Sequence, residues 1–133
     1  MVALYVTSNQ LFSGKSILCV GLAKRFAEEG FSFCYMKPVS TMARIEDGEV
    51  IDDDALFIKK FFDLPHPLSD LVPIALTPQT VEAILRETVK LDFEGQLKEA
   101  FRKHARDKDI LLLEGEGSMC EGYIIGLYKS YVA

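Results

Sequence analysis

VALYVTSNQLFSGKS, residues 2–16, is the stretch that decides the fold. Residues 2–7 are apolar and β-branched, which predicts a buried strand. A turn over residues 8–13 follows, and from Lys15 to Glu29 apolar residues recur at helical spacing, which predicts a helix. The turn matches the pattern G-x-x-x-x-G-K-[ST], except that Asn9 stands in place of the first glycine. A strand, this turn and a helix in that order predict a phosphate-binding loop.

Phosphate binding needs these residue types at these positions. A tight loop turns backbone N–H groups around phosphate oxygens, and the helix start adds a positive dipole. Lys15 supplies charge for the β- and γ-phosphates, and the Ser16 hydroxyl can coordinate Mg²⁺. Asn tolerates positive φ, so Asn9 weakens the match without removing it. An ordinary turn that contains Gly-Lys-Ser by chance is the alternative, but the flanking strand and helix favour nucleotide binding. The predicted nucleotide-binding residues are Asn9, Gln10, Leu11, Phe12, Ser13, Gly14, Lys15, Ser16 and Ile17.

The rest of the chain extends this start into an α/β pattern. A second strand over residues 31–36 completes a strand–helix–strand unit, for which parallel pairing and a right-handed crossover are expected. Loops are expected over residues 40–51 and over the proline-rich segment 64–78. The remaining elements expected are helices over 52–62, 78–89, 93–106 and 123–133, and a strand over 109–113. We therefore expect an α/β fold of the P-loop NTPase type, in three layers with a mainly parallel sheet.

Composition excludes several classes of partner. The chain carries 15 Lys and Arg against 20 Asp and Glu, and this acidic balance disfavours nucleic-acid binding. The 3 cysteines are odd in number and far apart, with no CxxC pair, which argues against a disulfide framework and a structural zinc site. No apolar run approaches the ~18 residues that a membrane span requires. We expect a cytoplasmic protein with no membrane partner.

Charged residues follow the second and third predicted strands. Lys37 comes directly after the second strand, and Glu114 closes the third. Ligands of an open parallel sheet lie outside the carboxyl ends of the strands, so both side chains should face the phosphate loop. Lys37 could serve phosphate or a developing negative charge as a second catalytic cation beside Lys15, or could be a solvated lysine. Glu114 follows apolar residues, where an unpaired charge is costly, so a metal or lysine partner is expected.

Four motifs, which follow one another along residues 2 to about 122, resemble those of the dethiobiotin synthetase family of P-loop NTPases. They are the phosphate loop, Lys37-Pro38-Val39, Asp54-Ala55 and the strand that closes on Glu114-Gly115. The resemblance also extends to the dethiobiotin synthetase-like N-terminal domain of phosphotransacetylase-type proteins, which we expect to be the closer relative. It implies that ATP phosphates are bound by Gly14, Lys15, Ser16 and Lys37, and Mg²⁺ by Ser16, Asp54 and Glu114. Asp54 could instead cap its helix, and Asp52 and Asp53 are alternative metal ligands.

The chain departs from the synthetase pattern around the expected substrate. Leu11 replaces a hydroxyl near the reacting carbamate, and Glu116, followed by Ser118 and Met119, stands among residues that are small in the family. A carboxylate beside an anionic carbamate is unfavourable by ~1 kcal/mol or more. We therefore expect a regulatory or nucleotide-sensing Mg-ATP-binding domain that does not convert diaminopelargonate to dethiobiotin by itself. The alternatives are an ATP-dependent ligase acting on a carboxyl or carbamate group and a degenerate interaction module.

Domain organisation follows from the same resemblance. Residues 1–133 are expected to form one dethiobiotin synthetase-like domain, as the N-terminal part of a longer domain. Further strands would then come from outside this segment, and the expected partners are nucleotide, further domains of the same protein or a second copy of the chain. Whether the domain acts as an ATPase or as a ligase is left open by these residues.

Overall fold

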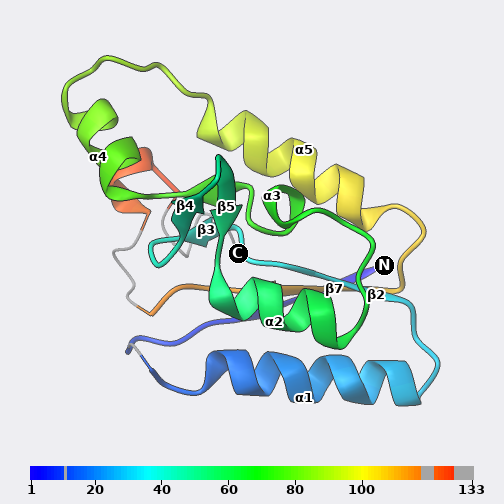
Figure 1. The fold of residues 1–133 in the computed structure, drawn as a ribbon. Coiled ribbons are helices and arrows are strands. Elements are labelled where there is room, and N and C mark those ends of the chain that lie inside the picture. Colours follow the sequence, from blue (N-terminus) through cyan, green and yellow to red (C-terminus); the bar gives the residue numbers. More distant parts are fainter. Residues whose placement is uncertain (11, 118–121, 128–133) are drawn as a thin grey trace.

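The computed structural model describes residues 1–10, 12–117 and 122–127. Its centre is a sheet of three parallel strands in the order β1-β7-β2 (Figure 1). These strands are β1 (Val2–Val6), β2 (Phe33–Met36) and β7 (Ile110–Glu114). Val6 lies opposite Glu114, and Met36 lies opposite Leu113. The carboxyl ends of all three strands therefore meet at one edge of the sheet.

Helices cover both faces of this sheet. Helix α1 (Lys15–Glu28) leads from β1 to β2 and packs on one face through the fully buried Cys19 and Ala23. Helix α5 (Phe93–Ala105) and the short α3 (Leu68–Leu71) lie on the other face (Figure 1). Leu111, Leu112 and Leu113 of β7 are buried between the two layers. The predicted three-layer α/β fold with a parallel sheet is confirmed.

Two further helices begin at side-chain caps that the sequence signals. Helix α2 (Asp53–Phe61) begins after Asp52, whose carboxylate accepts the backbone N–H of Ala55. Helix α4 (Pro78–Leu85) begins after Thr77, with proline at its first position. Helix α4 ends at Leu85, short of the predicted residue 89, and β2 begins at Phe33, two residues later than predicted.

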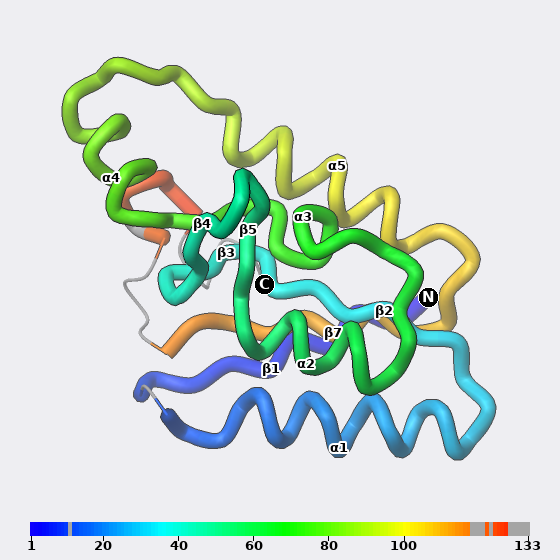
Figure 2. The backbone as a smooth tube through the Cα atoms, in the orientation of Figure 1, coloured from blue at the N-terminus to red at the C-terminus, as the bar shows by residue number. Residues whose placement is uncertain are grey.

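The two segments predicted as loops contain regular structure, so these predictions were wrong. Strands β4 (Arg44–Glu46) and β5 (Glu49–Ile51) form an antiparallel hairpin, which Figure 2 shows as a tight reversal of the backbone. Asp47 and Gly48 both have positive φ at its tip, as expected for an Asp-Gly turn. Strands β3 (Val39–Ser40) and β6 (Ile74–Ala75) pair in parallel. Two-residue strands are too short to show a periodic pattern in the sequence. Only their pairing with a distant segment identifies them as strands.

The last part of the chain is described over residues 122–127. There the chain forms a 3₁₀ turn, Tyr123–Ile125, and Leu127 packs in a small core with Val39, Ile74 and Leu76. The helix predicted over 123–133 is therefore wrong for residues 123–127, where only this 3₁₀ turn forms, and residues 128–133 lie outside the described residues. Within the described ranges, no helix has both the length and the apolar character that crossing a membrane requires.

Candidate functional site

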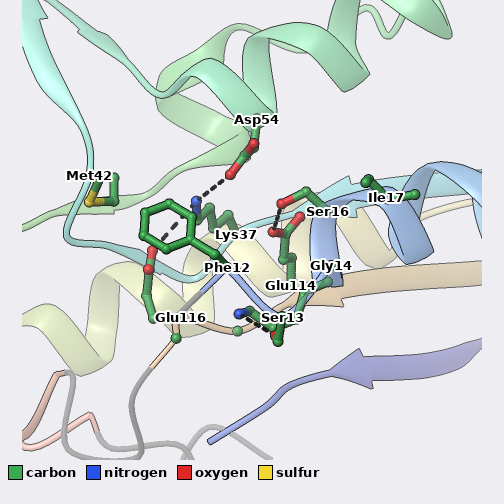
Figure 3. Close-up of a pocket in the computed structure, with 13 residues that line it drawn as sticks. Phe12, Ser13, Gly14, Ser16, Ile17, Lys37, Met42, Asp54, Glu114 and Glu116 are labelled. Atoms are coloured by element: carbon green, nitrogen blue, oxygen red, sulfur yellow. Dashed lines mark hydrogen bonds and ion pairs between the residues drawn. The ribbon is translucent and has the colours of Figure 1, made fainter. Parts of the chain in front are cut away.

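A pocket opens at the edge where the three strands end and α1 begins (Figure 3). Its volume is about 350 Å³. It is lined by residues from the phosphate loop, from the end of β2, from α2 and from the end of β7. Predicted site residues in its lining are Phe12, Ser13, Gly14, Lys15, Ser16, Ile17, Lys37, Asp54 and Glu114. The fold thus brings together residues that are distant in the sequence.

The backbone of the loop shows where a positive φ is needed. Gly14 precedes α1 with φ 83°, a left-handed conformation that favours glycine, while no atom stands within 4 Å of an added Cβ. Phe12 also has positive φ, at 51°. Asn9 is not among the residues with positive φ, so the expected reason for asparagine there was wrong. Leu11 lies outside the described residues.

Lys15 folds back over its own loop. Its Nζ donates to Ser8 Oγ at 3.0 Å, to Ser13 Oγ at 3.3 Å and to the Gln10 carbonyl at 3.5 Å. In the described part of the chain, no carboxylate forms an ion pair with Lys15. Its charge is held by neutral oxygens, which phosphate oxygens can replace with a gain in hydrogen-bond strength.

Ser16 and Glu114 are in direct contact. The Ser16 hydroxyl donates to Glu114 Oε1 at 2.6 Å, and the Tyr35 hydroxyl donates to Oε2 at 2.7 Å. Both Glu114 and Tyr35 are buried. Burial, and then the charge of Glu114, raise the pKa of Tyr35 well above its usual value, so this phenol remains a hydrogen-bond donor. Tyr35 thus holds the carboxylate at the pocket wall, a role that the sequence analysis did not predict.

Lys37 has a different environment in the same pocket. Its Nζ lies 3.0 Å from Asp52 Oδ2, 3.3 Å from Asp54 Oδ2 and 3.6 Å from Glu116 Oε1. Figure 3 shows Asp54 and Glu116 on opposite sides of it. Burial alone would lower the pKa of Lys37, but Glu116 and Asp52 outweigh burial and raise it. Lys37 is therefore a buried cation whose charge is already balanced by carboxylates.

The structure separates the roles of the three adjacent aspartates. Asp52 is buried, where it accepts the Ser40 hydroxyl at 2.6 Å and caps α2. Asp53 pairs with Arg44 at 2.9 Å, outside the pocket lining. Only Asp54 of the three lines the pocket, with its side chain 48% exposed. The sequence left these three residues as alternatives, and the Asp-x-x-Ala cap of α2 is the signal that could have assigned Asp52.

Sequence similarity to known proteins identifies the family of this chain. The family model described as the AAA domain matches residues 2–132. The chain belongs to this family. The chain is 24% identical over 120 residues to the ATP-dependent dethiobiotin synthetase BioD of Caldicellulosiruptor saccharolyticus. The alignment covers 90% of this chain and 49% of that protein. The chain is also 29% identical over 126 residues to a cobyric acid synthase of Clostridium botulinum. That alignment covers 81% of this chain and 25% of that protein.

The chain is thus a dethiobiotin synthetase-like P-loop NTPase domain, as the resemblance predicted. It spans about half the length of the synthetase and a quarter of the cobyric acid synthase that it matches. A closer relation to phosphotransacetylase-type proteins stays a prediction.

Proposed function

We propose that this domain binds ATP with Mg²⁺ in the pocket at the carboxyl ends of β1, β7 and β2. The observation that carries the proposal is the position of Lys15, whose Nζ is held by loop oxygens above the N-terminus of α1. Phosphates of the nucleotide would replace those oxygens and accept backbone N–H groups of the loop. The relation to an ATP-dependent synthetase supports ATP as the nucleotide.

The residues present fit Mg²⁺. Ser16, Asp54 and Glu114 offer oxygen ligands, which Mg²⁺ prefers, and they line one pocket. Two lysines and three carboxylates line the pocket, so its formal charge is negative before any phosphate enters. A divalent cation would offset the repulsion between these carboxylates and the phosphates. We infer that Glu114 and Ser16 hold the ion at the pocket wall and that Asp54 reaches it directly or through water.

An ATP-dependent ligase is the second candidate. Both relatives are named as enzymes that synthesise a product, and one as ATP-dependent. Two residues motivate the expectation that the chain does not ligate by itself: Leu11, which lies outside the described residues, and Glu116, which would repel an anionic substrate. In the structure, Glu116 is buried beside Lys37 and accepts hydrogen bonds from Thr41, so its charge is compensated. A regulatory or sensing role remains the alternative, and no contact of the described residues favours it over ligation.

Titration calorimetry tests the proposed binding. We expect ATP to bind the chain in the presence of Mg²⁺ and to bind much more weakly in excess chelator, because the pocket is negatively charged. GTP titrated in parallel measures base preference. Circular dichroism should first show that the sample is folded. If the folded chain then gives no heat of binding with Mg-ATP, only the interaction module remains as an alternative.

An assay of turnover separates the remaining roles. With diaminopelargonate, bicarbonate and Mg-ATP, a ligase releases ADP only when both substrates are present, and mass spectrometry detects dethiobiotin. Binding of ATP without substrate-dependent ADP release supports the regulatory role. Product that also forms with Lys15→Ala would show a contaminating enzyme instead.

A further inference from the structure

A second cluster of reactive side chains lies on the face of the sheet that α3 and α5 cover, whereas the nucleotide pocket lies at the edge where the strands end. Successive residues of a strand point to opposite faces. Tyr35 of β2 reaches Glu114 in the pocket wall, so Cys34 points toward the layer of α3 and α5. There it meets His104 from the last turn of α5 and His66 from the segment between α2 and α3. One ligand atom of each residue lies within 4.8 Å of the others.

The ring of His104 is oriented by a hydrogen bond on its far side. Its Nε2 lies 2.8 Å from the backbone carbonyl oxygen of Asp70 in α3. A carbonyl oxygen can only accept, so Nε2 carries the proton, and in the neutral ring the lone pair is on Nδ1. Nδ1 faces Cys34 Sγ at 3.3 Å. Histidine ligands of metals usually donate their other ring N–H to such a carbonyl, which fixes the tautomer.

His66 is held beside this pair. The rings of His66 and His104 meet edge to face, with centroids 4.5 Å apart. Lys59 of α2 donates to the backbone carbonyls of Leu64 at 2.7 Å and His66 at 2.6 Å, which positions this segment. His104 and Cys34 are buried, whereas His66 is half-buried. Solvent can therefore reach the cluster from the His66 side.

We propose that Cys34, His66 and His104 bind a Zn²⁺ ion. One thiol and two imidazoles are a donor set suited to Zn²⁺, with water at an open fourth position on the side of His66. Usual bond lengths and tetrahedral angles place sulfur and nitrogen ligands about 3.6 Å apart, close to the Cys34–His104 spacing. As the S–Zn bond forms, the S–H bond of Cys34 breaks and its proton goes to the buffer.

The ion would fasten β2, α5 and the segment before α3 to one another. Sulfur and nitrogen donors distinguish this site from the nucleotide pocket, whose donors are oxygens and suit Mg²⁺. Burial lowers the pKa of His104 and that of His66, and a proton on His104 would lower the pKa of His66 further, which favours neutral rings at pH 7. Neutral imidazole is the form that binds metal.

A packing role without metal is the alternative. Burial raises the pKa of Cys34 to about 11, so the metal-free thiol is protonated and can donate to His104 Nδ1. In that case the cluster is an ordinary buried hydrogen bond beside a pair of rings. The two interpretations differ in whether added metal acquires a thiolate ligand.

Co²⁺ is the probe for a thiolate ligand. The chain is freed of metal and titrated with Co²⁺ without oxygen or nucleotide, in a buffer with a non-thiol reductant. We expect a near-ultraviolet thiolate-to-cobalt band, with the visible bands of tetrahedral Co²⁺, which saturate at one equivalent and disappear when Zn²⁺ is added. Absence of the near-ultraviolet band overturns the proposal.

Variants assign the band to this cluster. Cys34→Ser should abolish it, and His66→Asn should weaken binding at least tenfold with little risk to folding, because His66 is half-buried. Cys19→Ser is the matched control, since Cys19 is also a buried free cysteine but belongs to α1, on the other face of the sheet. It should keep the band, as should Cys120→Ser. A band that survives in Cys34→Ser, or affinity unchanged in folded His66→Asn, would contradict the site.

Thermal unfolding supplies a second readout. A ligand that binds only the folded chain raises its melting temperature. Zn²⁺ should raise the midpoint of the wild type and of Cys19→Ser, with a smaller shift in His66→Asn. An equal shift in all three proteins would place the metal elsewhere.

Discussion

Lys15 and Lys37 line the same pocket in opposite electrostatic settings. Lys15 is held by two serine hydroxyls and a carbonyl, within a loop that is largely exposed. Lys37 is 3% exposed and lies within 4 Å of three carboxylates. The first lysine can transfer its interactions to a ligand with little cost to the fold. The second holds together carboxylates that would repel one another without it.

This difference teaches that a lysine can line such a pocket without serving as a phosphate ligand. The sequence places Lys15 at the start of a helix and Lys37 at the end of a strand, and predicts that both bind phosphate. In the structure, the charge of Lys37 is shared among Asp52, Asp54 and Glu116, so we infer that it mainly organises the pocket wall. Four predictions can break or sharpen this distinction.

We expect the largest effect for Lys37→Met, which should lower the free energy of unfolding. Removing one partner of a buried ion pair leaves an uncompensated buried charge and costs about 3–5 kcal/mol. Here Asp52 and Glu116 are both buried and would both lose their cation. Chemical denaturation measures the free energy of unfolding. Lys15→Met is the control and should change it by less than about 0.5 kcal/mol. Equal losses in the two variants would show that both lysines serve the fold.

The next effect is expected for nucleotide affinity. Lys15→Ala should weaken Mg-ATP binding at least about 100-fold, about 2.7 kcal/mol, because a charged donor to phosphate is lost. Circular dichroism should show an unchanged fold. The control is Lys24→Ala, an exposed lysine of α1 that pairs with Glu28. Affinity within a few-fold of the wild type in Lys15→Ala would remove the phosphate-loop assignment.

A smaller effect should separate metal binding from phosphate binding. Glu114→Gln keeps the shape of the side chain but loses its charge, so ATP affinity with Mg²⁺ should fall about tenfold, about 1.4 kcal/mol. Without Mg²⁺, the same variant should bind ATP no more weakly than the wild type, because one repelling carboxylate is gone. Asp53→Asn is the control, since Asp53 pairs with Arg44 outside the pocket lining. Equal losses with and without Mg²⁺ would contradict a metal role for Glu114.

The sequence predicts much of the pocket lining, because local patterns indicate where these residues lie, and nucleotide binding there stays a prediction. The strand–turn–helix order places the phosphate loop, and the rule for parallel sheets places Lys37 and Glu114 at the same edge. The partners of these residues are decided by packing across the chain instead. Tyr35 reaches Glu114 only because β2 and β7 are neighbours in the sheet. Neither residue carries a local signal for the other.

The cluster on the other face shows the same limit. Cysteine spacing argues against structural zinc, because that rule considers pairs of nearby cysteines. Cys34 and His104 are brought together by the packing of α5 on the sheet, and no spacing in the sequence indicates that contact. The proposed zinc site is therefore an inference that only the folded chain supports.

The last prediction concerns pH and uses both lysines. Burial alone would raise the pKa of Asp52, but Lys37 and the Ser40 hydroxyl outweigh burial and lower it. A carboxylate with a lowered folded pKa stabilises the fold above its unfolded pKa, near 3.8, and this stability is lost as pH falls through the folded pKa. In Lys37→Met, burial is no longer opposed by that cation, so the pKa of Asp52 should rise and acid should relieve the repulsion. The loss caused by Lys37→Met should therefore shrink as pH falls from about 7 to 4, whereas the small effect of Lys15→Met should stay constant. Denaturation of the three proteins across this range measures both differences, and a loss that does not change with pH would show that charge is not its cause.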